Sequence, residues 1–243
     1  MSAMYKPLMR SKKMRTNADI KIAVDLWCSN RVAAKELYGH ISDWDVSRVT
    51  NMRNLFHSQI LFNNDISRWD VSSVTNMTCI FCNARSFNQV IENWDVSNVT
   101  NMNYMFSNAC KFNQTIGNWN VSNVTNMNGM FGGAESFNQP IGNWDVSNVI
   151  DMTNMFSETD AFNQPIGNWN VSQVTDMSCM FIRARKFNQP IGNWNVSNVI
   201  DMSAMFMWAC KFNQPVMNWN VSNVCDIRDM FKDAKAFKQA LWV

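Results

Sequence analysis

The sequence predicts an α/β solenoid of about eight 25-residue coils, and three observations lead to this fold class. The first is an uninterrupted series of tryptophans spaced 25 residues apart: Trp44, Trp69, Trp94, Trp119, Trp144, Trp169, Trp194 and Trp219. The second is a set of apolar positions in each unit that combines a strand-like and a helix-like spacing. The third is an N-terminal segment of different character, which can cover the open end of the first coil.

A short strand is expected at the start of each unit. In the unit that begins at Phe137, Trp144 and Val146 alternate with polar residues, which is the period of a half-buried strand. The spacing of Ile141, Trp144 and Val146 fits the first half of the leucine-rich-repeat pattern, but Val149 stands where that pattern has Asn or Cys. The fold is therefore predicted to be leucine-rich-repeat-like.

A short helix is expected to follow the strand. Met152, Met155, Phe156 and Thr159 have the i, i+3, i+4, i+7 spacing of one helix face. The residue before the first Met is always Asn or Asp, which is typical of a helix N-cap. These cap positions are Asn51, Asn76, Asn101, Asn126, Asp151, Asp176, Asp201 and Asp226. Each coil is thus expected to contain a strand, a corner, a helix and a return loop.

Two further polar columns have more than one interpretation. The Asn of each Phe-Asn-Gln segment is predicted to bond the backbone of the next coil and so to form a ladder, with a simple turn Asn as the alternative. This column contains Asn63, Asn88, Asn113, Asn138, Asn163, Asn188 and Asn213. The residue after each Trp is Asp mostly where the cap residue is Asn. This division either limits repulsion between stacked carboxylates or marks a cation site.

The chain divides into a basic arm (residues 1–16), a capping helix (17–36) and the repeat solenoid (37–243). In the capping helix, apolar residues recur at helical spacing from Ile20 to Trp27, and Asn17 is the expected N-cap. The arm is interpreted as a docking arm for an acidic partner, nucleic acid or a membrane surface, or as a tail without a function of its own. Its basic residues are Lys6, Arg10, Lys12, Lys13 and Arg15.

The repeat unit Phe-Asn-Gln-Pro-Ile-Gly-Asn-Trp-Asp-Val-Ser-Asn-Val, followed by Thr/Ile-Asn/Asp-Met-x-x-Met-Phe, resembles the BspA-like repeat family of surface proteins, a Mycoplasma-type domain of unknown function. The resemblance covers roughly residues 37–240. The segment from Tyr38 to Trp44 also resembles the start of such arrays in large DNA viruses and protists. The resemblance implies surface display, adhesion and protein–protein contact, and it carries over no catalytic residue.

Composition narrows the setting and the class of partner. The N-terminal residues contain no apolar run of the secretory type, and no stretch reaches the length of a membrane span. The seven cysteines have irregular spacings, which indicates a reducing compartment. We therefore expect an intracellular or virion location. After residue 16 acidic residues outnumber basic ones, so the repeat body is not expected to bind nucleic acid.

No group of residues in the sequence indicates catalysis. His40 and His57 are the only histidines, and no nucleophile, phosphate-loop or dinucleotide motif occurs. A metal site of His57, Cys79 and Cys82 is conceivable, but incidental surface cysteines are the favoured interpretation. The sequence therefore predicts no enzymatic activity, no cofactor and no metal.

The variable columns are the expected place for recognition, because packing occupies the fixed ones. Near the C-terminus an exposed apolar cluster with a basic rim is predicted, unless its members fold over the local loop. The cluster and rim are Ile182, Met207 and Trp208 with Arg183, Arg185, Lys186 and Lys211. Trp242 is expected to lie over the last coil or at an edge that a partner covers.

The predicted function is a non-enzymatic scaffold for protein–protein interaction in a larger assembly. Its most specific version is a minor capsid protein or other virion component of a large DNA virus. The alternative is a surface-displayed adhesin that binds host protein or glycan.

Overall fold

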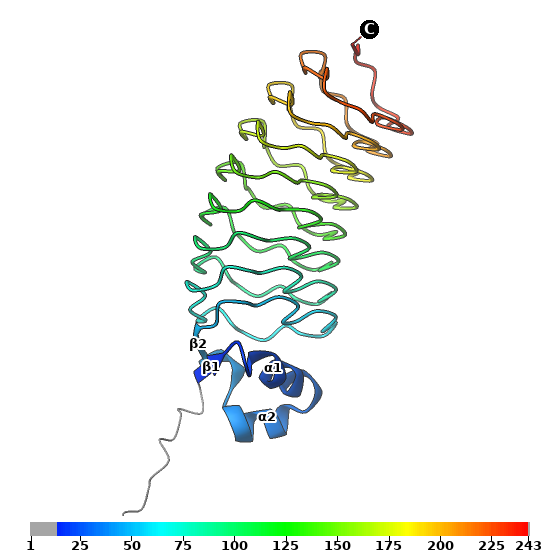
Figure 1. Cartoon of the computed structure of the whole chain (residues 1–243). Helices are drawn as coiled ribbons and strands as arrows, with labels where there is room; N and C mark the ends of the chain where they lie inside the picture. The colour runs from blue at the N-terminus through cyan, green and yellow to red at the C-terminus, as the bar shows by residue number, and fades with distance from the viewer. Residues whose placement is uncertain (1–13, 243) are drawn as a thin grey trace, which may run out of the picture.

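The computed structural model describes residues 14–242, which form a stack of coils closed at the N-terminal end by two helices (Figure 1). The elements are β1 (Met14–Thr16), α1 (Ile20–Ser29), α2 (Arg31–Tyr38), the 3-10 helix η1 (Ile41–Asp43) and β2 (Asp45–Arg48). Strands β1 and β2 pair in parallel and form a two-stranded sheet. After Arg48 the described chain forms no further helix or regular strand.

Two helices occupy the segment where one capping helix was predicted. Helix α1 buries Ile20, Ala23, Val24 and Trp27, so its predicted apolar face is correct. The predicted N-cap is wrong, because the Asn17 side chain reaches across to the first coil. Its Oδ1 accepts from the backbone N–H groups of Thr50 and Asn51 at 3.0 and 3.2 Å. Asn17 therefore joins the helical cap to the repeat array.

The helix predicted in every coil is absent. In the first coil Leu55 N–H donates to the Met52 carbonyl and Gln59 N–H donates to the Phe56 carbonyl, so this segment is a series of tight turns. Met52 N–H and Phe56 N–H donate instead to carbonyls of the next coil, at 2.9 and 2.8 Å. A helix that begins at Met52 would need the Phe56 N–H for its bond to the Met52 carbonyl, four residues earlier.

The spacing between coils explains why turns replace the helix. The stacked rings of Phe131 and Phe156 in successive coils lie 5.7 Å apart. A helix with its side chains has a diameter of about 10–12 Å, so helices cannot stack at this repeat. The apolar positions were nevertheless assigned correctly, because Met152, Met155 and Thr159 are all buried. Spacings of three and four residues fit these turns as well as they fit a helix.

The strand predicted in every coil forms only in the first coil, as β2, and is absent from the later coils. Trp144 N–H donates to Ile141 and Val149 N–H donates to Val146, so two turns interrupt the segment. Only one residue per coil forms a β-bridge, and it is the predicted cap residue; parallel bridges run from Asn51↔Asn76 to Asp201↔Asp226. The cap side chain accepts from the N–H two residues later, as Asp151 does from Thr153 at 2.9 Å. The Asn/Asp preference therefore reflects a turn.

On the opposite side of each coil, side chains make the bonds between coils. The Asn ladder is confirmed: Asn138 Oδ1 accepts from the backbone N–H of Asn163 at 2.9 Å and from Gln164 Nε2 at 3.1 Å. The repeating Trp adds a bond that we did not predict from the sequence. Trp169 Nε1 donates to the Ile141 carbonyl of the preceding coil at 3.1 Å, and its equivalents do the same along the array.

The two kinds of bond give the coils different spacings on their two sides. Where backbone bonds join the coils, the Phe181 and Phe206 rings lie 5.4 Å apart. Where side chains join them, the Trp194 and Trp219 rings lie 6.4 Å apart. A bond through a side chain spans a longer gap than a direct N–H···O bond, so the stack is wider on the tryptophan side.

Candidate contact surfaces

In each coil the last turn of the run of tight turns lies at one edge of the array. We call it the turn edge and define it as residues 158–160, 183–185, 208–210 and 233–235. The first position of each turn has a left-handed backbone, with φ from 56° to 59° in these four coils. The first four coils have small residues there: Ser58, and then Asn83, Asn108 and Gly133, whose types tolerate this conformation more easily. Large side chains begin at Glu158.

Trp208 and Arg183 pack against each other on the turn edge. The Arg183 guanidinium lies 4.5 Å from the centre of the Trp208 ring. Its Nη1 also contacts Glu158 Oε1 of the preceding coil at 2.6 Å. An arginine between a carboxylate and an aromatic face is held by both. Three successive coils thus contribute an acid, a base and an aromatic ring in line.

A second ion pair lies beside this row. Arg185 Nη1 contacts Asp160 Oδ2 at 3.0 Å. A hollow of about 440 Å³ opens next to the two arginines. It is lined by Arg183, Arg185, Trp208, Cys210, Asp233 and Lys235. The turn edge is therefore acidic at residues 158–160, and from residue 183 onward it combines an aromatic ring and basic groups with the carboxylate of Asp233.

The predicted exposed apolar cluster is wrong in part. Ile182, Met207 and Trp208 are half-buried, because their coils stack closely and Met207 accepts a backbone bond from Arg183 N–H at 2.8 Å. Lys186 and Lys211 are exposed but do not line the hollow. The sequence reasoning missed Cys210, Asp233 and Lys235, although their 25-residue offsets from Arg185 and Trp208 would have placed them.

Two predicted contact regions, Trp242 and the basic arm, are at the ends of the chain. Trp242 is half-buried against the last coil, and its Nε1 is buried without a hydrogen-bond partner in the described structure. Lys6, Arg10, Lys12 and Lys13 lie outside the described residues. Arg15 was wrongly assigned to a docking arm, because it is 4% exposed, pairs with Asp19 at 3.0 Å and lies over the Tyr38 ring.

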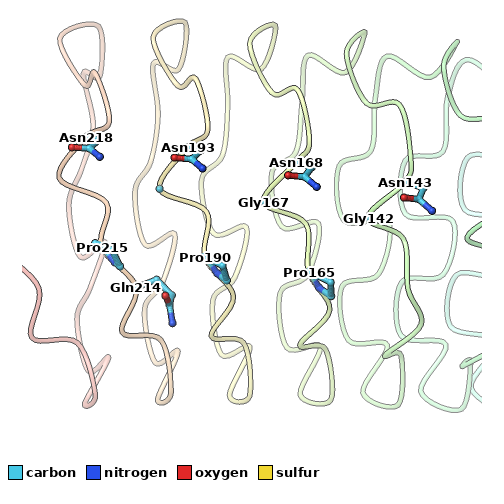
Figure 2. A pocket seen from close by; sticks show the side chains of 11 residues that line it. Gly142, Asn143, Pro165, Gly167, Asn168, Pro190, Asn193, Gln214, Pro215 and Asn218 are labelled. Atoms are coloured by element: carbon cyan, nitrogen blue, oxygen red, sulfur yellow. The ribbon is translucent and has the colours of Figure 1, made fainter.

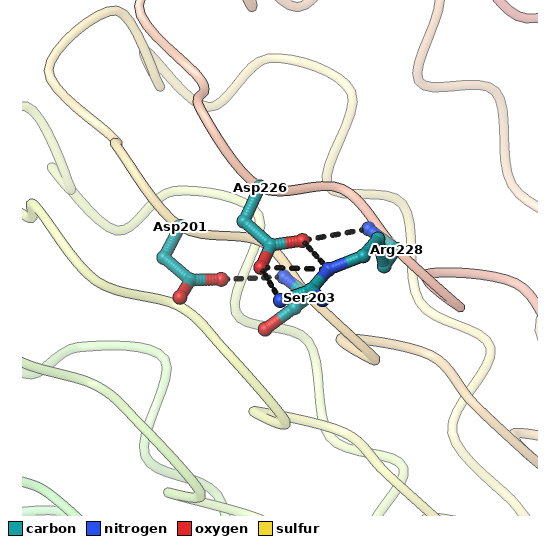
Figure 3. Close-up of polar contacts among 4 residues, drawn as sticks. All are labelled: Asp201, Ser203, Asp226 and Arg228. Atoms are coloured by element: carbon teal, nitrogen blue, oxygen red, sulfur yellow. Dashed lines mark hydrogen bonds and ion pairs between the residues drawn. The ribbon is translucent and has the colours of Figure 1, made fainter.

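The acidic columns use their carboxylates locally (Figure 3). Asp201 Oδ1 accepts from Ser203 N–H at 2.7 Å. Asp226 accepts from the backbone and the guanidinium of Arg228, and these hydrogen bonds lower the pKa of Asp226 to about 2. Across residues 14–242 no three His, Cys, Asp or Glu side chains gather as metal ligands. Burial raises the pKa of Cys82 to about 11, so this thiol is protonated at neutral pH.

A second hollow of about 440 Å³ lies on the tryptophan side, over four successive coils (Figure 2). We call it the amide groove. Three rows of residues line it: prolines, glycines and asparagines that recur every 25 residues. They are Pro165, Pro190 and Pro215; Gly142, Gly167 and Gly192; and Asn143, Asn168, Asn193 and Asn218, with Gln214 beside them. None of the lining residues is charged.

The glycine row has a structural cause. A Cβ atom on Gly142 would lie 2.4 Å from the Pro165 carbonyl oxygen, and the equivalent contacts at Gly167 and Gly192 are as close. The coil that follows therefore packs directly on the glycine backbone. The groove floor is main chain, and only its two rims present side chains.

A family described as Mycoplasma protein of unknown function, DUF285, matches the chain twice, over residues 28–143 and 133–242. No curated protein and no solved structure matches it. In residues 14–242 no helix has the length and apolar character needed to cross a membrane.

Proposed function

The chain belongs to the DUF285 family, and we propose that it is a non-enzymatic repeat scaffold that binds another protein at the turn edge. The residues of the fixed columns pack between coils and are not available for a partner. The variable columns are therefore the place to look for a binding surface. The turn edge is where the variable columns bring together an aromatic ring, two arginines and a hollow. Aromatic residues and arginine are the residue types that contribute most to protein interfaces.

The observation that carries the proposal is Trp208, a bulky residue on a left-handed backbone that packs on Arg183 and lines the hollow. Its φ of 58° is a conformation that costs a bulky residue about 1–2 kcal/mol. Asn occupies the same position at Asn83 and Asn108 with less cost. A strained residue that an ordinary one could replace points to a role other than stability. We infer that contact with a partner retains Trp208.

The test replaces Trp208 with Asn in the full-length chain. Asn relieves the strain of the left-handed backbone, and this gain offsets the loss of the contact between Arg183 and the ring. The free energy of unfolding should therefore change by about 1 kcal/mol or less. A photo-reactive residue in place of the exposed Lys211 then reports a bound partner in cells that express the chain. The adduct should disappear in the Trp208→Asn variant.

Tyr104→Asn is the matched control. Tyr104 is also an aromatic residue in a left-handed conformation, with φ 53°, but it lies four coils earlier and outside the turn edge. This variant should keep the adduct. An adduct that persists in Trp208→Asn, or one that both variants lose equally, would exclude Trp208 as the contact residue.

The more specific version, a component of a large-DNA-virus particle, is supported only by the resemblance at residues 38–44. Purified particles of the source virus would have to contain the chain. The alternative, an adhesin for host protein or glycan, predicts accessibility of the folded chain to antibody on intact cells. Both settings are compatible with the same turn-edge contact.

A further inference from the structure

The amide groove presents a row of hydrogen-bonding groups that the protein itself does not use. Asn143, Asn168, Asn193 and Asn218 are exposed, and none makes a hydrogen bond with another described residue. Figure 2 shows their side chains on the same side of successive coils, with the proline row parallel to them. Each amide offers a carbonyl acceptor and an NH₂ donor. A peptide backbone offers the same two groups in complementary form.

The spacing of the coils favours an extended chain as the occupant. Trp194 and Trp219, which directly follow Asn193 and Asn218, have ring centres 6.4 Å apart. Two residues of a β-strand span about 6.4–6.8 Å, because the rise per residue is about 3.2–3.4 Å. A strand running along the array would therefore place an equivalent backbone group at each coil. On the backbone-bonded side, the 5.4 Å spacing of Phe181 and Phe206 would lose this register within a few coils.

We propose that the amide groove binds an extended polypeptide segment, two residues per coil, whose backbone is hydrogen-bonded by the four asparagine amides. The segment belongs to a partner protein, and eight of its residues span the four coils. Alternate side chains face the proline row and are uncharged, because no lining residue can pair with a charge. This proposal names a second surface for the protein partner suggested above and does not depend on the turn edge.

The probe is a random eight-residue peptide library displayed on phage and selected on the full-length chain. The most enriched sequence is then made as a terminally blocked peptide, and its Kd is measured by calorimetry. We expect peptides of uncharged alternating residues. N-methylation of alternate backbone amides that face the asparagines should abolish binding, although all side chains are kept. A library without enriched sequences would overturn the proposal. So would a peptide that still binds after methylation of the amides that face the asparagines and also after methylation of the amides that face away from them.

Two variants of the groove locate the contact. In Asn168→Asp with Asn193→Asp, the acceptors remain and the donors are lost; Asp43 shows that this column accepts Asp. Each lost neutral hydrogen bond of about 1 kcal/mol is roughly a factor of five, so the Kd should rise about tenfold or more. Asn168→Ala with Asn193→Ala removes donors and acceptors without adding charge and should weaken binding at least as much.

The matched control is Asn93→Asp with Asn118→Asp, in the same column but outside the groove. It should leave the Kd unchanged. Trp208→Asn should leave it unchanged as well, so a failure of the turn-edge proposal and a failure of this one are distinguishable. Equal weakening by the control pair would place the peptide elsewhere. Binding of a neutral oligosaccharide with the same dependence on Asn168 and Asn193, but of no library peptide, would replace the polypeptide by a glycan.

Discussion

The first and last coils of the array differ in how far their side chains are buried. At the N-terminal end, helix α1 covers the first coil, and its Val24 and Trp27 are 0–1% exposed. At the other end, Ile227 occupies a column whose seven other members are fully buried, yet it is 43% exposed. Phe237 and Val224 of the last coil are only half-buried. The same repeat unit is therefore a core element at one end and an open face at the other.

This difference shows that a coil derives its burial from its neighbours. Each coil contacts the coil before it and the coil after it, so stability in such arrays is close to a sum of unit and interface contributions. The first coil has the helical cap as a neighbour, whereas the last coil has none among the described residues. We expect opening to begin at the C-terminal end, and the predictions below test this from the largest effect to the smallest.

The largest effect is expected at the cap. Trp27→Ala removes a fully buried ring, its edge contact with Trp44 at 6.1 Å and its Nε1 bond to Asn64 Oδ1 at 3.1 Å. The free energy of unfolding should fall by about 3–5 kcal/mol, which is typical of large core truncations. Urea unfolding followed by circular dichroism measures the loss. Leu37→Ala, at a position 57% exposed on α2, is the control and should cost about 0.5 kcal/mol or less.

A single column provides the next comparison. Met202→Ala should cost about 2–5 kcal/mol because the side chain is fully buried. Ile227→Ala, one coil later, should cost about 1 kcal/mol or less because water already reaches that side chain. The same urea experiment measures both variants. Equal losses would mean that the last coil is as well covered as the inner ones.

The buried positions could be predicted from the sequence, but the backbone conformation of the coils could not. The 25-residue period and the apolar columns identified the buried positions, because residues 25 apart occupy equivalent places in any backbone that repeats. The secondary structure was wrong because Met152, Met155, Phe156 and Thr159 fit both a helix and tight turns. The stacking distance decides between these structures, and no single unit contains that information.

The next prediction concerns the Asn ladder. Asn138→Ala leaves the backbone N–H of Asn163 without its acceptor, whereas the Gln164 amide keeps its bond to the Asn138 backbone carbonyl. An unsatisfied buried donor costs about 1–3 kcal/mol, and because Asn163 is half-buried the loss should lie at the lower end of this range. Asn213→Ala removes the acceptor of Lys238 N–H, which belongs to the open end, and should cost less. Hydrogen exchange of these two amides distinguishes the cases, since Lys238 should exchange faster than Asn163 in the unaltered chain.

The contact surfaces were predictable to a lesser degree than the core. The sequence indicated Trp208, Arg183 and Arg185 because they depart from the repeat. It did not indicate their acidic partners Glu158 and Asp160, which become neighbours only when coils stack at a 25-residue offset. The amide groove was missed for the opposite reason. Its asparagines follow the repeat so regularly that they were attributed to packing.

The smallest effect is the pH dependence that the column after each Trp gives to the first five coils. Hydrogen bonds from the serine two residues later lower the pKa of Asp45, Asp95 and Asp145, all in the first five coils. The later coils have Asn170, Asn195 and Asn220 in this column. A carboxyl group whose pKa is lowered by folding stabilises the protein above its unfolded pKa of about 3.9, and this contribution is lost as the pH falls through the folded value. Acid should therefore remove this contribution from the first five coils, whereas the last coil loses the contribution of Asp226, whose pKa is lowered by Arg228.

The test replaces Asp45, Asp95 and Asp145 together with Asn. Asn keeps the turn, as Asn120 does when its Oδ1 accepts from Ser122 N–H at 3.1 Å. The Tm of the unaltered chain should fall more between pH 6 and pH 3 than the Tm of the triple variant. Because the three groups are exposed, the difference should be small, and salt should reduce it only slightly if hydrogen bonds rather than long-range charge cause the shifts. An equal fall in both proteins would show that these carboxylates contribute nothing to the greater stability of the capped end.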